Sequence, residues 1–195
     1  VVAVSAIVTV FAKSGNSGGA GNGTSITETS EGDAELNITD TPKATTTSKT
    51  GSALTSAEVY AKVSPSNVGI VVYSQSSSSA SGEGSGIVMG ENKDHTCTYI
   101  ITCAHVISGE GVKAVVQLHD GKQYDAEIVG YDSRTDIGVL KIKATGFTAA
   151  EFGDSTKLSV GETVYAIGNP GGTEFFGSFT NGMVSAISRT VSSQI

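Results

Sequence analysis

The chain has 195 residues, with 25 Gly, 3 Pro, 2 Cys and no Trp, and 16% of its residues are charged. Its net charge of −7 argues against a nucleic-acid partner, because phosphate binding depends on clustered Lys and Arg side chains. Two cysteines are too few for a disulfide scaffold or a four-cysteine zinc site.

The first third of the chain differs in composition from the rest. Residues 1–12 are apolar except for Ser5 and Thr9. As a helix they would rise about 18 Å, less than the roughly 30 Å hydrocarbon core of a membrane. We interpret them as part of a transmembrane anchor helix, with a signal-peptide core or a buried strand as alternatives. Residues 13–66 are rich in Ser, Thr and Gly, which predicts a disordered linker.

One short helix is predicted near the end of this linker. Thr55 is a typical N-cap residue for a helix that begins at Ser56. Pro65 restricts the backbone of the residue before it, so the helix should end there.

From residue 67 onward the sequence consists of short β-branched runs separated by Gly, Ser, Asp and Asn. No stretch has a sustained apolar period of 3.6 residues, which disfavours a parallel α/β fold and favours a small β-barrel or sandwich. Asp120-Gly121 signals a hairpin. Two later runs, 163–169 and 179–189, predict the start of a second β unit. The earlier runs are 68–74, 84–90, 99–107, 114–120, 123–132 and 137–143.

Two polar side chains stand at the ends of apolar runs. His105 lies near the end of the run 99–107, where an imidazole can be held rigidly and still reach a substrate as a general base. A histidine buried for structural reasons is the alternative. Asp136 directly precedes the run 137–143, and a carboxylate there can accept a hydrogen bond from the imidazole Nδ1–H. Together they indicate a catalytic His–Asp pair.

The two cysteines are not predicted to form a disulfide. Cys97 and Cys103 are six positions apart, and an extended strand separates such residues by about 20 Å, beyond bridging distance. We therefore interpret Cys103 as small apolar packing beside His105.

Five segments occur in the order expected for one protein family: GSGIVMG, YIITCAHVI, VVQLHDGKQYDAEIVGYDSRTDIGVLKI, FGDSTKLSVGETVYAIGNPGG and FTNGMVSAISR. They resemble landmarks of the HtrA (Deg-like) serine proteases. The resemblance implies an all-β, chymotrypsin-like double β-barrel, with the first barrel complete over 67–145. Residues 146–195 would be the inter-barrel segment and the start of a truncated second barrel. His105 would be the general base and Asp136 its orienting carboxylate.

The nucleophile is expected outside this sequence. In the resembled family the reactive serine lies in a G-N-S-G-G element further along the second barrel, so we expect it beyond Ile195 and expect this fragment alone to be inactive. The same letters occur at 15–19. We reject Ser17 as the nucleophile, because the linker provides no strand framework to hold its Oγ about 3 Å from an imidazole.

The resemblance implies a serine-type endopeptidase that uses a Ser-His-Asp triad and an acyl-enzyme to degrade misfolded extracytoplasmic proteins. It implies no cofactor, and His95, His105 and His119 lack zinc-protease spacing, so no metal site is expected. Its substrates would be unfolded or damaged polypeptides. The protein would cross the bacterial cell membrane once, with the protease domain outside the cytoplasm, and it would assemble as a homotrimer. A catalytically inactive polypeptide-binding homologue is the alternative, and a β-sandwich binding module is a third interpretation.

Overall fold

The computed structural model describes residues 54–74 and 79–187, together with the backbone of 24–26. Residues 1–12, predicted to be part of a membrane anchor, and Ser17 lie outside the described residues. Across the ranges that are described, no helix combines the length and apolar character needed to cross a membrane. The predicted domain boundaries stay predictions.

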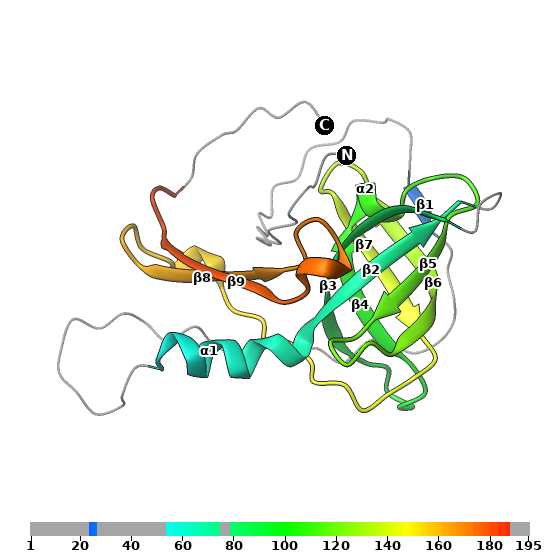
Figure 1. The fold of residues 1–195 in the computed structure, drawn as a ribbon. Helices are drawn as coiled ribbons and strands as arrows, with labels where there is room; N and C mark the ends of the chain where they lie inside the picture. Colours follow the sequence, from blue (N-terminus) through cyan, green and yellow to red (C-terminus); the bar gives the residue numbers. More distant parts are fainter. Residues whose placement is uncertain (1–23, 27–53, 75–78, 188–195) are drawn as a thin grey trace.

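The strands between residues 67 and 142 form an antiparallel sheet that curves into a closed barrel (Figure 1). The barrel strands follow the order β6-β5-β2-β3-β4-β7, and an additional pairing between β6 and β7 closes the ring, so neither is left as an exposed edge. This closure confirms the all-β prediction and decides for a barrel over a sandwich. The strands are β2 (Asn67–Tyr73), β3 (Ala80–Glu91), β4 (Thr98–Cys103), β5 (Lys113–Gln117), β6 (Gln123–Asp132) and β7 (Ile137–Ile142).

A short strand and a helix lie in the segment predicted as linker. Strand β1 (Thr24–Ile26) pairs antiparallel with β6. Helix α1 (Ser56–Val63) begins after the predicted cap Thr55, whose side chain accepts a hydrogen bond from the backbone N–H of Glu58. Glu58 in turn accepts from the backbone N–H of Thr55, which completes a capping box. The helix predicted from Thr55 is therefore confirmed.

The run 99–107 was predicted as one strand, and this prediction is wrong at its end. Strand β4 stops at Cys103, and the chain continues as a short helix, α2 (Ala104–Ile107). The helical turn forms because Asp136 accepts the first two N–H groups of α2, one at its backbone carbonyl (3.1 Å) and one at its carboxylate (2.9 Å). The apolar sequence continues across this point, so its pattern does not reveal the change.

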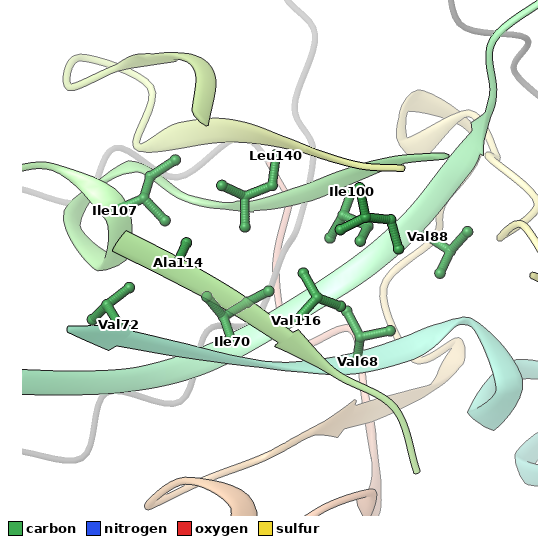
Figure 2. Packing of buried hydrophobic residues seen from close by; sticks show 10 residues of the cluster. Val68, Ile70, Val72, Val88, Ile100, Ile107, Ala114, Val116 and Leu140 are labelled. Atoms are coloured by element: carbon green, nitrogen blue, oxygen red, sulfur yellow. The ribbon is translucent and has the colours of Figure 1, made fainter. Parts of the chain in front are cut away.

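The barrel interior is filled by aliphatic side chains that come from alternate positions of the strands (Figure 2). They are buried, and the side chain of Ile107 brings α2 into the same cluster. The helix is thus fixed to the end of the barrel by apolar packing as well as by hydrogen bonds. The members are Val68, Ile70, Val72, Val88, Ile100, Ile107, Ala114, Val116, Leu140 and Ile142.

A two-stranded hairpin lies beside the barrel, with α1 below it in Figure 1. Its strands are β8 (Thr163–Gly168) and β9 (Ser178–Met183). Tyr60 of α1 packs edge-on against Phe179 of β9, with ring centroids 5.2 Å apart. Three 3₁₀ turns complete the described elements: η1 (Ser64–Ser66), η2 (Ser155–Lys157) and η3 (Thr173–Phe175).

Asn169, directly after β8, joins this hairpin to the barrel. Its side-chain amide donates to the carbonyl of Val68 (2.8 Å) and its amide oxygen accepts from the side chain of Asn67 (3.0 Å). Its backbone N–H donates to Ser85 Oγ (2.8 Å). Asn169 is only 3% exposed, so each bond forms away from water, where losing a partner is costly. Asn169 therefore attaches the hairpin to β2 and β3.

Gly86 is a position where the core leaves no room for a side chain. A Cβ there would lie 2.8 Å from Ile100 and 3.0 Å from both Ile70 and Val68. We expect Gly86→Ala to lower the free energy of unfolding by about 1–3 kcal/mol through overpacking. Gly182→Ala is the matched control, because no atom lies within 4 Å of its Cβ. Urea denaturation of both variants measures the difference, and equal stabilities would contradict the packing described.

Candidate active site

The antiparallel pairing of β4 with β7 determines where the two predicted site residues lie. Cys103, the last residue of β4, is in register with Ile137, the first residue of β7. The residues that follow β4 therefore lie next to the residue that precedes β7, at one end of the barrel. His105 and Asp136, which are 31 positions apart in the sequence, meet there.

The His105 and Asp136 side chains form a direct hydrogen bond. His105 Nδ1 lies 2.7 Å from Asp136 Oδ2, and the other carboxylate oxygen accepts the backbone N–H of His105 at 2.9 Å. Since a carboxylate only accepts, Nδ1 carries a proton, and in the neutral imidazole Nε2 then has the lone pair. The two side chains are 32% and 26% exposed, so solvent reaches this pair. The sequence prediction that they lie within hydrogen-bonding distance is confirmed.

The backbone at Asp136 has an unusual conformation. Its φ of +56° lies in the left-handed region, where Asp is tolerated better than most residues with a side chain. Two positions later, Gly138 lets α2 approach β7 closely, because a Cβ there would lie 2.6 Å from Ile107 Cδ1. These two features place the carboxylate directly beside the first turn of α2.

Cys103 belongs to the same group of side chains, which the sequence did not predict. Its Sγ lies within 4.8 Å of a carboxylate oxygen of Asp136, and the residue is only 9% exposed. Burial, followed by the negative charge of Asp136, raises the pKa of the Cys103 thiol to about 11. Small apolar packing is thus an incomplete account of Cys103. The sequence carries a Cys-x-His spacing, but nothing in it links Cys103 to Asp136.

The three side chains have donor atoms within 4.8 Å of one another: Cys103 Sγ, an imidazole nitrogen of His105 and a carboxylate oxygen of Asp136. Within the described ranges this is the one grouping of three or more such residues close enough to share a metal ion. The other two histidines lie outside it. His95 pairs with Glu91, and His119 is an exposed residue after β5.

The arrangement is the one needed by a general base. A carboxylate that holds Nδ1–H fixes the imidazole tautomer and stabilises the imidazolium that forms when Nε2 takes a proton.

Residues 84–194 match the family described as Trypsin-like peptidase domain. The chain belongs to the trypsin-like peptidases. The resemblance to HtrA and Deg-like serine proteases is confirmed by relatives and by solved structures.

Two relatives and one structure illustrate the similarity. Serine protease Do-like HtrA of Lactobacillus helveticus is 45% identical over 126 residues, 61% of this chain and 30% of that protein. A probable periplasmic serine endoprotease, DegP-like, of Halomonas elongata is 43% identical over 108 residues, 55% of this chain and 21% of that protein. The structure of a serine endoprotease from Yersinia pestis, 29% identical, has a TM-score of 0.56 and covers 70% of this chain and 46% of that chain. The chain spans less than a third of these two curated relatives.

The pKa of the Cys103 thiol should depend on the charge of Asp136. In Asp136→Asn we expect this pKa to fall below about 11 but to stay above the ordinary value of 9.0, because burial is the larger cause and remains. Alkylation of Cys103 as a function of pH, followed by peptide mass spectrometry, measures it. An unchanged pKa would show that the carboxylate charge does not reach the thiol.

Proposed function

We propose that this chain is part of an HtrA-like serine endopeptidase, with His105 as general base and Asp136 as its orienting carboxylate. The observation that carries the proposal is the 2.7 Å contact between His105 Nδ1 and Asp136 Oδ2 at a solvent-accessible barrel end, which leaves the lone pair on Nε2 in the neutral imidazole. Membership of the trypsin-like peptidases supports it.

The nucleophile of the proposed enzyme is a serine beyond Ile195. This placement rests on the family resemblance, in which the reactive serine follows the segment that resembles FTNGMVSAISR. The serine hydroxyl gives its proton to Nε2 of His105 as its oxygen forms a bond to the scissile carbonyl carbon. The imidazolium then gives that proton to the leaving amine, and an acyl-enzyme remains for water to hydrolyse. Asp136 keeps its charge throughout and stabilises the imidazolium.

The substrates we propose are misfolded polypeptides outside the cytoplasm. The relatives support this proposal, since their names describe serine proteases and a probable periplasmic endoprotease. We also propose that residues 1–12 anchor the protein in a bacterial membrane and that the assembled enzyme is a homotrimer. These two proposals rest on the apolar composition of residues 1–12 and on the family resemblance.

Substitution of the two side chains tests the proposed mechanism. In the full protein we expect His105→Ala to abolish cleavage of an unfolded protein such as reduced casein. Asp136→Asn should lower kcat by about ten-thousand-fold, because the amide favours the wrong imidazole tautomer. His119→Ala is the control, since this histidine is exposed and lies outside the site. The assay measures the rate of peptide release at equal concentrations of folded protein.

Each outcome of that assay has a distinct meaning. Retained cleavage by His105→Ala would refute the general-base role. An unsubstituted full protein that binds casein without cleaving it would instead identify the protein as the inactive polypeptide-binding homologue.

A further inference from the structure

We propose that Cys103, His105 and Asp136 form a binding site for a divalent transition-metal ion such as Zn²⁺. Their donor atoms already lie within 4.8 Å of one another, and the group is accessible from solvent through His105 and Asp136. Metal binding by this group needs no nucleophile and no substrate, so it is independent of the proposed function.

The three donors are those that zinc prefers. Zinc is bound by Cys sulfur at about 2.3 Å, by His nitrogen at about 2.0–2.1 Å and by carboxylate oxygen at about 2.0–2.2 Å. Three protein ligands with a water in the fourth position form an open tetrahedral site, which suits a group that is partly exposed. His105 Nδ1 and Asp136 Oδ2 are 2.7 Å apart, and all three donor atoms lie within 4.8 Å of one another, so small shifts are enough for them to surround one ion.

The framework holds two of the donors in place before any ion arrives. Cys103 is fixed at the end of β4 by its pairing with Ile137, and Asp136 is fixed by the N–H groups of α2 that it accepts. The carboxylate is therefore held beside the imidazole before an ion binds. Little conformational entropy remains to be lost when an ion binds.

Binding would displace protons in a defined way. The Cys103 thiol loses its proton to solvent when its sulfur bonds to the metal, and this release makes the affinity lower than that of a ready thiolate. The ion takes the lone pair of His105 Nδ1, so the imidazole proton must reside on Nε2. A protonated Nε2 cannot accept a proton from a serine. If the proposed function holds, an ion at this site therefore inhibits the protease by removing its base.

The second cysteine provides a matched control for the test. Cys97 is also a buried free thiol just before β4, but it is not part of the cluster. We expect calorimetric titration of the 195-residue chain with Zn²⁺ to give the same affinity for the unsubstituted protein and for Cys97→Ala. Cys103→Ala should bind more than about 100-fold more weakly, because a ligand is lost.

A titration with Co²⁺ identifies the ligands directly. A sulfur-to-cobalt charge-transfer band should appear in the unsubstituted chain and in Cys97→Ala, and it should be absent in Cys103→Ala. Equal Zn²⁺ affinity in Cys103→Ala, or a cobalt band that Cys97→Ala removes, would overturn the proposed site. Circular dichroism checks that each variant is folded. Asp136→Asn is a second ligand variant, in which we expect weaker Zn²⁺ binding. An unchanged Zn²⁺ affinity in this variant would count against the site.

A protease assay separates this inference from the proposed function. In an active full protein, Zn²⁺ should inhibit the unsubstituted enzyme and Cys97→Ala to the same extent. An enzyme that binds Zn²⁺ through Cys103 without losing activity would refute the inhibitory role. A protein that binds Zn²⁺ through Cys103 but shows no protease activity under any condition would refute the proposed function while supporting the metal site.

Discussion

The carboxylate of Asp136 is the group on which the rest of the candidate site depends. One oxygen accepts the backbone N–H of His105 and the other accepts its imidazole, so a single side chain both starts helix α2 and orients the ring at that start. The charge of the same carboxylate raises the pKa of the Cys103 thiol, whose Sγ lies within 4.8 Å of it. Because Asp136 acts on all three groups, the local backbone, the imidazole tautomer and the protonation of the thiol are linked to one another.

The closed barrel keeps this convergence in place. Pairing of β4 with β7 brings Asp136 to the end of β4, and pairing of β6 with β7 prevents β7 from moving away as a free edge. The apolar cluster stabilises the barrel, and Ile107 of α2 packs into this cluster. The site residues can therefore stay partly exposed, as their chemistry requires, while the elements that carry them are held by buried contacts.

The sequence predicted the features that local pattern determines. Strand β6 has the predicted bounds 123–132, since β-branched residues flanked by turn residues define it, and α1 begins after Thr55 because capping is a local interaction. Helix α2 was missed because the interaction that forms it comes from Asp136, far away in the sequence. The closeness of Cys103 to Asp136 and the buried bonds of Asn169 were missed for the same reason. A single sequence shows which residues can hydrogen-bond, and only the folded chain shows which ones meet.

The position of Cys103 beside Asp136 links the general base to the proposed metal site, and the two compete for the same side chains. A general base of this type needs a carboxylate that stays charged and hydrogen-bonded to the imidazole Nδ1–H. A thiol beside that carboxylate is compatible with this need as long as it keeps its proton, and burial helps to keep it there. A divalent cation reverses the balance, because its charge favours the thiolate and competes for the same carboxylate and the same nitrogen. The short distance between Asp136 and His105 thus orients the imidazole, and it also places two metal ligands beside the Cys103 thiol. The same arrangement therefore accounts for both the general base and the proposed binding of transition-metal ions.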